Sequence, residues 1–305
     1  MESVYCTILS KSRFYQFLAL VISISQVTKD HFTFYVLCVD KECYQLLKKL
    51  GWKNIILYYD EDEMNQQIIL LKQERKLHEY CWTLKASLME LIFNKNPKVN
   101  RVTYMDSDLF FWKSPEILFK NQPDSSVLLI KEEKYNPEWK REFVQKLTEI
   151  TGKYNSGFVS FRRDKNSLAC LKWWKEKSIE SCTISPKELK FGDQKYLDEM
   201  PQLFSNVNEI STPGVNIGPW NYRKYHFARK QKEVFIDQTL LVFYHFSGIR
   251  ILDSKHIKMV HNKEENIPFV YEVYKEVIQK TIKLASIVDP QFNGFTTKDD
   301  LESYW

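Results

Sequence analysis

Two aspartates one residue apart form the pattern with the clearest chemical meaning in this sequence. Asp106 and Asp108 come directly after the apolar run Val102–Met105, which reads as a buried strand. Two carboxylates at this spacing, with a third ligand from elsewhere, suit a hard cation such as Mn²⁺ or Mg²⁺. Such a cation could bridge a diphosphate and neutralise the charge that develops on a leaving nucleotide. The alternative is a solvated turn that carries two aspartates.

A histidine late in the chain could supply the third ligand. His245 lies in the run Tyr244-His245-Phe246-Ser247-Gly248, near the end of the predicted strand Val242–Phe246. A lone histidine beside aromatic residues is more often structural, so both interpretations stay open at this point.

Two other short runs carry polar side chains where predicted elements begin. In Phe191-Gly192-Asp193-Gln194, the acid and the amide could bind sugar hydroxyls, or Asp193 could cap a helix. In Tyr154-Asn155-Ser156-Gly157-Phe158, the asparagine could place an amide against a sugar, with a glycine that permits close approach. Ordinary turn chemistry is the alternative for the second run.

These side chains need a framework that brings them together. In the first 110 residues apolar strands alternate with helices such as Tyr80–Phe93, which implies a largely parallel sheet with helices on both faces. Ligands of such sheets bind beyond the carboxyl ends of the strands, where Asp106 and Asp108 lie. The second half is mixed, with helices at Leu168–Lys177 and Phe269–Ile287 and an ordered loop at Ser211–Trp220. The predicted strands are Val4–Leu9, Phe32–Val39, Asn54–Tyr58, Val102–Met105, Ser126–Ile130, Gly157–Arg162 and Val242–Phe246.

The chain order of these motifs resembles that of GT-A-type glycosyltransferases. Asp-x-Asp, then Asn-Ser-Gly, then Asp-Gln and a late histidine is similar to the families of glycogenin and of bacterial lipooligosaccharide galactosyltransferases. The set is most similar to bacterial nucleotide-diphospho-sugar transferases, and the similarity spans roughly Val4 to Arg250. The resemblance implies a GT-A Rossmann-like fold, α/β with a mixed, mostly parallel sheet, over residues 1–262. We expect a nucleotide-binding half (1–110), a sugar and acceptor half (111–262) and a helical C-terminal extension (263–305).

The resemblance also implies roles for individual residues. Asp106, Asp108 and His245 match manganese ligands, with Mg²⁺ as the alternative ion. Asp193 and Gln194 match the residues beside the reacting sugar. A neutral amide such as Gln194 could steady an oxocarbenium-like centre but is a poor nucleophile, which favours a same-face, retaining substitution. The residues expected to bind the donor are Tyr5, Thr7, Lys85, Asp106, Ser107, Asn155, Ser156, Gly157 and Arg250.

The sequence departs from the family pattern at two places. Family members often carry a lysine six residues after the metal histidine, where this chain has Ile251. Arg250 could replace that lysine as a phosphate clamp, because arginine makes bidentate phosphate contacts, or it could be plain surface. The segment Gly218–Tyr222 has no assigned counterpart and could stack on a sugar or pack between the halves.

Composition excludes several classes of protein. Hydrophobic residues are 44% and charged residues 27%, with 8 Gly and 10 Pro, which excludes disordered and collagen-like chains. The net charge is +5 (44 Lys and Arg, 39 Asp and Glu), without the basic run that would predict nucleic-acid binding. A mild positive charge suits phosphate-bearing ligands or an anionic membrane.

Cellular location is predicted from the cysteines and the N-terminus. The six cysteines form no Cys-x-x-Cys pair, and MESVYCTILS has no basic region typical of a signal peptide. The apolar run Phe17–Ile24 is too short to cross a membrane. We therefore expect a cytoplasmic enzyme, in peripheral contact with the inner face of a membrane if the C-terminal aromatic residues dock there. These are Phe292, Phe295, Tyr304 and Trp305.

The predicted activity is metal-dependent transfer of a hexose from a nucleotide diphosphate donor, most simply a UDP-sugar. The acceptor would be a hydroxyl of a bacterial glycan or lipid-linked saccharide, as in polysaccharide biosynthesis. A haloacid-dehalogenase-like phosphatase also uses Asp-x-Asp after a strand, but some 105 residues precede Asp106 here. A sugar nucleotidyltransferase needs an early glycine-rich loop, and the first glycine is Gly51. A non-catalytic sugar-binding protein is the remaining alternative.

Overall fold

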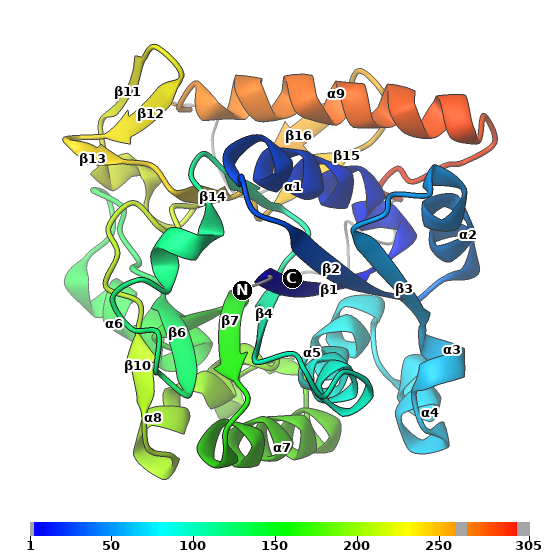
Figure 1. Cartoon of the computed structure of the whole chain (residues 1–305). Helices are drawn as coiled ribbons and strands as arrows, with labels where there is room; N and C mark the ends of the chain where they lie inside the picture. The colour runs from blue at the N-terminus through cyan, green and yellow to red at the C-terminus, as the bar shows by residue number, and fades with distance from the viewer. Residues whose placement is uncertain (1–2, 260–266, 298–305) are drawn as a thin grey trace.

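The computed structural model describes residues 3–259 and 267–297, and its centre is a seven-stranded sheet (Figure 1). The strand order is β10-β6-β7-β4-β1-β2-β3. Every neighbouring pair is parallel except the two pairs that involve β7, which runs antiparallel to both β4 and β6. The strands are β1 (Ser3–Leu9), β2 (Phe32–Cys38), β3 (Ile55–Tyr59), β4 (Arg101–Met105), β6 (Val127–Lys131), β7 (Tyr154–Arg162) and β10 (Val207–Glu209).

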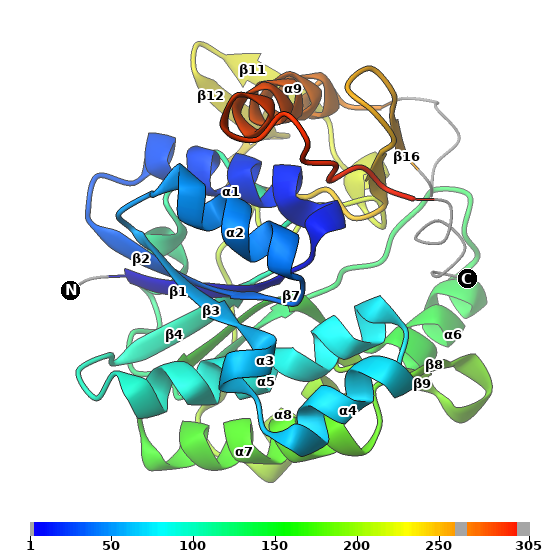
Figure 2. The same cartoon turned by 90° about the vertical axis from the view of Figure 1, so that its right-hand side faces the viewer.

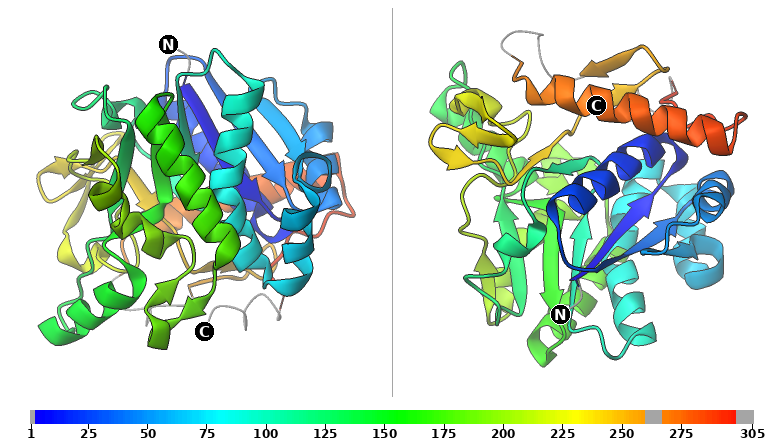
Figure 3. Two further views of the ribbon diagram at one scale, coloured as in Figure 1. Left: turned by 90° about the horizontal axis from the view of Figure 1, so that it is seen from below. Right: turned by 45° about the horizontal axis from the view of Figure 1, so that its top comes forward.

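Helices cover both faces of this sheet. In Figure 2, α1 (Phe14–Val27), α2 (Lys41–Leu50) and α9 (Val270–Val288) lie above the sheet, and α5 (Leu77–Lys95) and α7 (Lys165–Glu180) lie below it. The left view of Figure 3 shows α5 and α7 side by side across the strands. Each layer encloses its own hydrophobic core, because alternate side chains of every strand point to opposite faces.

The remaining elements lie around the sheet. Two matter for the site: β5 (Leu109–Phe111), which pairs antiparallel with β14 (Phe243–His245), and the 3-10 helix η4 (Gln194–Asp198). The other α-helices and strands are α3 (Asp60–Glu63), α4 (Gln66–Glu74), α6 (Arg141–Thr151), α8 (Met200–Leu203), β8 (Ile184–Ser185), β9 (Lys190–Phe191), β11 (Phe227–Lys230), β12 (Glu233–Ile236), β13 (Thr239–Leu240), β15 (Ile249–Ile251) and β16 (Ile257–Met259).

Local sequence chemistry explains where several elements begin. The Asp40 carboxylate accepts a hydrogen bond from the backbone amide of Cys43 (2.8 Å) and so caps the first turn of α2. Asp164 does the same for Ser167 at the start of α7 (2.9 Å). The long buried helix α1 is apolar on most sides because it lies between the sheet and α9.

The predicted α/β class with a mostly parallel sheet and a C-terminal helix is confirmed. Two details differ from the sequence prediction. The run Asn155–Gly157 lies inside β7, which begins at Tyr154, whereas the strand was expected to start at Gly157. The strand that carries His245 belongs to a separate two-stranded sheet beside the central one.

The C-terminal aromatic residues that the structure describes pack on the body of the protein. Phe292 lies against Phe14 and Tyr15, with ring centroids 4.7 and 5.9 Å away, and Phe295 lies 5.4 Å from Tyr15. Packing against α1 therefore accounts for both rings. Tyr304 and Trp305 lie outside the described residues.

Candidate active site

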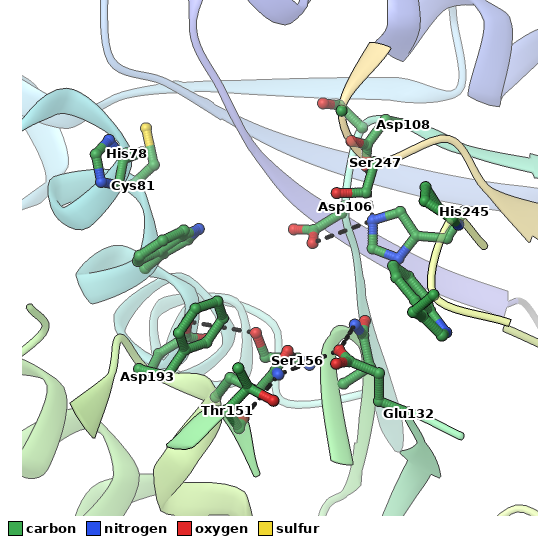
Figure 4. A pocket seen from close by; sticks show the side chains of 18 of the residues that line it. His78, Cys81, Asp106, Asp108, Glu132, Thr151, Ser156, Asp193, His245 and Ser247 are labelled. Atoms are coloured by element: carbon green, nitrogen blue, oxygen red, sulfur yellow. Dashed lines mark hydrogen bonds and ion pairs between the residues drawn. The ribbon is translucent and has the colours of Figure 1, made fainter. Parts of the chain in front are cut away.

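A single large cavity contains most of the predicted site residues (Figure 4). It measures about 640 Å³ and opens beyond the carboxyl ends of β1 and β4. The predicted site residues that line it are Lys85, Asp106, Ser107, Asp108, Asn155, Ser156, Asp193, Gln194, His245 and Arg250.

Asp106, Asp108 and His245 form a compact cluster of potential metal ligands. One ligand atom from each residue lies within 4.8 Å of the others. The Nε2 atom of His245 lies 3.0 Å from an Asp108 oxygen and 3.9 Å from an Asp106 oxygen. Antiparallel pairing of β5 with β14, which places His245 opposite Leu109, brings the distant histidine beside the aspartates. The sequence alone could not show this pairing.

The electrostatics of this cluster favour the binding of a cation. Burial opposes ionisation of Asp108, but His245 and then Arg13 outweigh it and hold the pKa of this carboxyl well below its usual range. Burial lowers the pKa of His245, and Asp108 more than reverses that effect, so the net shift is upward. Two carboxylates and an imidazole are a donor set that Mn²⁺ accepts readily, and Mg²⁺ less so because it prefers oxygen ligands. The Nδ1 atom of His245 is buried and has no hydrogen-bond partner among the described residues.

Lys85 connects the metal cluster to the predicted sugar site. Its ammonium nitrogen lies 3.3 Å from Asp106 and 3.5 Å from Asp193, and it donates a hydrogen bond to the Ser156 hydroxyl (3.0 Å). Burial by itself lowers the pKa of Lys85, but the two carboxylates outweigh it, so the ammonium form is stabilised. A buried cation between the metal site and the sugar site is well placed for a phosphate.

Asp193 presents a carboxylate that the fold only partly satisfies. One oxygen accepts a hydrogen bond from Ser156 (3.3 Å), while the other, Oδ2, is buried with the Lys85 ammonium 3.5 Å away and no hydrogen-bond partner in the described structure. Burial raises the pKa of Asp193 to about 6, and Lys85 offsets part of that shift. An acceptor atom held in this way can receive a hydrogen bond from a ligand hydroxyl.

Gln194 and Asn155 are held in fixed orientations by Glu132. The amide nitrogens of Asn155 and Gln194 donate to the same Glu132 oxygen (2.7 and 3.2 Å), and Gln194 also donates to the carbonyl oxygen of Thr151 (2.9 Å). The side-chain oxygen of Gln194 accepts from the backbone amide of Ser156 (3.1 Å). These contacts position the amide and leave it a poor nucleophile.

Gly157 lies where the strand β7 passes close to the potential metal ligands. A β-carbon built at this position would lie 2.6 Å from His245 Cε1, 2.7 Å from Asn155 Oδ1 and 2.8 Å from Asp106 Oδ2. No larger residue fits without moving these groups. Close approach of the backbone to these side chains therefore explains the glycine, while close approach to a sugar stays a prediction.

Together, a cluster of potential cation ligands, a buried ammonium group and an ordered set of polar side chains suit a ligand that carries a diphosphate and a sugar. The sequence of the chain agrees: residues 30–205, more than half of it, match the family model for nucleotide-diphospho-sugar transferases. The chain belongs to this family.

Two curated relatives of this transferase cover nearly its whole length. A protein of Bacillus subtilis strain 168, the uncharacterized YfnF, is 44% identical over 98% of this chain and 99% of its own. A second protein of the same strain, the uncharacterized YfnD, is 29% identical over 96% and 94%. Neither name assigns a substrate.

Solved glycosyltransferases share the fold of this transferase. The galactosyltransferase LgtC, solved with donor and acceptor sugar analogues, matches with a TM-score of 0.58 and 14% identity, over 92% of this chain and 96% of that one. Mouse xyloside xylosyltransferase 1 matches with a TM-score of 0.53 and 12% identity, over 81% and 98%. At these identities the likeness shows the fold alone.

The structure places Tyr5 and Thr7 away from the cavity. Strand β1 continues to Leu9, so the strand end that reaches the cavity is Ile8 and Ser10. Tyr5 lies in the core and its hydroxyl donates to Glu116 (2.9 Å), while Thr7 is fully buried inside the sheet. Neither residue lines the space where a donor could bind.

The structure places Arg250 in the cavity wall and buries Ile251 completely. The side-chain chemistry that family members place six residues after the histidine is therefore available here from the preceding position. A second arginine, Arg13, lies 3.8 Å from Asp108 and also lines the cavity.

Sequence reasoning missed several residues of the transferase's cavity. Glu132 follows β6 and has no motif around it, and its ion pair with Lys134 (2.9 Å) joins positions only two residues apart. Trp220, in the segment that had no assigned counterpart, lies edge-on to the His245 ring with centroids 5.2 Å apart. The Pro219-Trp220 pair is visible in the sequence, but only the tertiary fold shows that Trp220 lies beside His245.

Proposed function

We propose that this protein is a metal-dependent glycosyltransferase that moves a hexose from a nucleotide diphosphate, most simply UDP, to an acceptor hydroxyl. The observation that carries the proposal is the continuity of one cavity from the metal cluster through Lys85 to Asp193, Asn155 and Gln194. That order matches the order of metal, diphosphate and sugar in such a donor.

Different side chains of the site would bind different parts of the donor. Asp106, Asp108 and His245 would hold Mn²⁺ or Mg²⁺, which supplies charge neutralisation to the diphosphate when bound. Lys85 and Arg250 would bind phosphate oxygens, since both are cationic and line the cavity. Ser107, Ser156 and Gly157 complete this end of the site, and Asp193 with Asn155 would bind sugar hydroxyls.

The arrangement supports retention of configuration at the transferred sugar. The Gln194 amide lies at the cavity but is already fixed by Ser156, Glu132 and Thr151, which suits a group that steadies positive charge on the anomeric carbon. In the proposed step the bond from that carbon to the phosphate oxygen breaks and a bond to the acceptor oxygen forms. The acceptor proton passes to the leaving phosphate oxygen, so no separate base is needed.

The proposal extends to the setting of the reaction. The acceptor would be a bacterial glycan or lipid-linked saccharide, and the protein would act in the cytoplasm or on the inner face of a membrane. No helix among the described residues is long and apolar enough to cross a membrane. All six cysteines are free thiols, which agrees with a reducing compartment.

The test is nucleotide release from a panel of UDP-, GDP- and CMP-sugars with Mn²⁺, Mg²⁺ or EDTA. We expect slow UDP release from one donor without acceptor, abolished by EDTA. No nucleotide release from any donor, together with no donor binding in calorimetry, would contradict the proposal. Donor binding without turnover, even when glycan acceptors are added, would instead favour a sugar-binding protein, and cleavage of simple phosphate esters would favour a phosphatase.

Replacement of a metal ligand gives the sharpest variant. We expect Asp108→Asn to lower metal-dependent UDP release by at least about 100-fold, because it removes an anionic ligand from a buried site. Asp124→Asn, at a carboxylate that is 90% exposed beside Arg162, is the matched control. The metal assignment would be refuted if both variants lost UDP release equally, or if Asp108→Asn released UDP at the same rate with and without EDTA.

A further inference from the structure

The cavity has an apolar wall that the proposed function does not use. Trp139, Phe143 and Leu147 line the cavity at intervals of four residues, along and just before α6, and the series ends at Thr151, the last residue of the helix. Residues four apart lie on one face of a helix. Phe143, Leu147 and Thr151 therefore share one face of α6, and Trp139, just before the helix, continues the stripe by contact with the Phe143 ring (centroids 5.4 Å apart). Phe143 keeps 49% of its surface exposed.

The inner end of this stripe is anchored at the proposed reaction centre. The carbonyl oxygen of Thr151 accepts a hydrogen bond from the Gln194 amide (2.9 Å). From Thr151 the helix rises about 6 Å to Leu147 and about 12 Å to Phe143. A sugar ring is roughly as long as the first of these steps, so apolar contacts begin about one ring beyond the reacting hydroxyl.

The stripe lies at the sugar end of the site, opposite the nucleotide end. In Figure 4, Thr151 and Glu132 lie at the opposite end of the cavity from His78 and Asp108. The polar residues Ser10, Ser12 and Arg13 line the cavity near Asp108, where a nucleoside would follow the diphosphate. A donor bound in this direction would not occupy the α6 wall, so this wall is available to the acceptor.

The chemistry of the wall changes with depth. At its inner end the wall adjoins charged residues, the partly buried Glu132 and the buried Lys134 with which it pairs. Toward the opening the lining is apolar, with Phe143 and Leu147 from α6 and Ile184 and Phe191 from the β8–β9 hairpin, which packs beside α6. A ligand that matches both ends has a hydroxylated head and an apolar tail.

We infer that the acceptor is an amphipathic glycoside, in which about one sugar ring separates the reacting hydroxyl from an alkyl or aryl group that packs on Trp139, Phe143 and Leu147. This inference rests on the proposed function and names its acceptor class. Aromatic side chains also stack on sugar rings, so Trp139 would contact the ligand where its sugar ring joins the apolar group.

The experiment compares octyl and methyl β-glycosides of glucose, galactose and N-acetylglucosamine, each below its micelle concentration. Binding to the full chain, preloaded with UDP and Mn²⁺, is measured by saturation-transfer NMR titration. We expect at least one octyl glycoside to bind about tenfold or more tightly than its methyl partner, since one buried apolar group of that size gives at least that factor. The same octyl glycoside should accelerate UDP release from the donor.

The control variants assign the effect to the stripe. Phe143→Ser should reduce octyl binding to the methyl level and remove the octyl-dependent acceleration of UDP release. Ile287→Ser, at a side chain on α9 that is 80% exposed, should change neither. Equal binding of octyl and methyl glycosides for all three sugars, or octyl binding that survives Phe143→Ser, would overturn the inference.

Sedimentation and UDP release show which hypothesis a negative result contradicts, the amphipathic acceptor or the proposed function. A change in sedimentation of Phe143→Ser would mean that the stripe contacts a second copy of the chain, which also overturns the inference. Metal-dependent UDP release that persists without any octyl preference would refute the amphipathic acceptor alone. Absence of donor binding and UDP release would refute the proposed function itself.

Discussion

At the scale of single residues, the site depends on how closely backbone and side chains can approach. Gly157 shows this directly, because the space that a β-carbon would need is occupied by His245, Asn155 and Asp106. These belong to two different parts of the proposed site, the metal cluster and the sugar contacts. One atom added here would therefore disturb both parts together.

Gly157→Ala should abolish metal-dependent UDP release while the fold survives. The nearest atoms lie 2.6 to 2.8 Å from the new carbon, so the ligands must shift. We expect at least about a tenfold loss of Mn²⁺ affinity, the range seen when ligand orientation is disturbed. Gly51→Ala is the control: its φ of 62° predicts a loss of stability, with nothing nearer than 3.9 Å and no loss of activity. Full activity of Gly157→Ala would contradict the crowding argument.

His78, in the cavity wall beside Trp82, predicts a pH dependence of stability. Burial, followed by Lys76, Arg13 and Arg250, lowers the pKa of His78 to about 4, against 6.5 in the unfolded chain. Between these values the unfolded chain binds a proton that the folded chain does not, so the free energy of unfolding falls as pH drops from 6.5 to 4. The loss amounts to up to roughly 3 kcal/mol.

Urea unfolding of His78→Gln at pH 7.5 and pH 4.5 tests this. We expect the variant to lose less stability than the parent on acidification, by up to roughly 2 kcal/mol. His226→Gln, on the exposed surface, goes through the same titration for comparison. Parallel stability curves for His78→Gln and the parent protein would show that this histidine does not set the slope.

At the scale of elements, the end of β6 organises the sugar half of the site. Glu132 follows that strand, accepts from Asn155 on β7 and from Gln194 on η4, and pairs with Lys134. Three elements are thus aligned through one carboxylate. A buried network of this kind restricts each amide to one orientation.

Glu132→Gln should reduce kcat for UDP release by about tenfold or more and leave Mn²⁺ affinity unchanged. The neutral amide brings its own N–H donors against those of Asn155 and Gln194, so the orientation of both amides is lost. Glu133→Gln, at the neighbouring exposed carboxylate that pairs with Lys224 (2.6 Å), is the matched control. If Glu132→Gln raises KM for the donor but spares kcat, Glu132 affects binding and does not orient the reacting groups.

At the scale of the whole molecule, the C-terminal helix packs against the strand that carries His245, a proposed metal ligand. Tyr274 of α9 stacks on Phe246 with ring centroids 3.8 Å apart, and Tyr271 shares a hydrogen bond with Tyr244 (3.0 Å). Phe246 and Tyr244 flank His245 in the chain. Residues near the two ends of the chain, on α1 and α9, therefore share one core above the sheet.

Tyr274→Ala should lower the free energy of unfolding by about 3–5 kcal/mol, as expected when a large buried aromatic side chain is truncated. Chemical denaturation followed by far-UV circular dichroism measures the change. Ile287→Ala on the same helix, at a side chain that is 80% exposed, should shift the curve by less than about 0.5 kcal/mol. Equal shifts for both variants would mean that α9 does not support this core.

Most of the sheet could be predicted from the sequence, because buried strands and amphipathic helices leave a periodic pattern of apolar residues. The potential metal ligands, Asn155, Asp193 and Gln194 could be named because each lies in a short motif at or near the end of an element, whereas Lys85, in the middle of α5, was expected only from the family resemblance. Tyr5 and Thr7 were expected at the donor from the resemblance, but both lie inside β1, several residues before the strand end at Leu9 that the pattern predicted.

The sequence by itself determined the family, the α/β class and the residue types available for chemistry, since these depend on local order along the chain. Only the tertiary structure decided which of them meet. The pairing of β5 with β14 brings His245 to Asp108, and Glu132 meets Asn155 and Gln194 across gaps of 23 and 62 residues. The apolar stripe of α6 faces the cavity for the same reason: contacts between distant segments depend on packing, which no local pattern records.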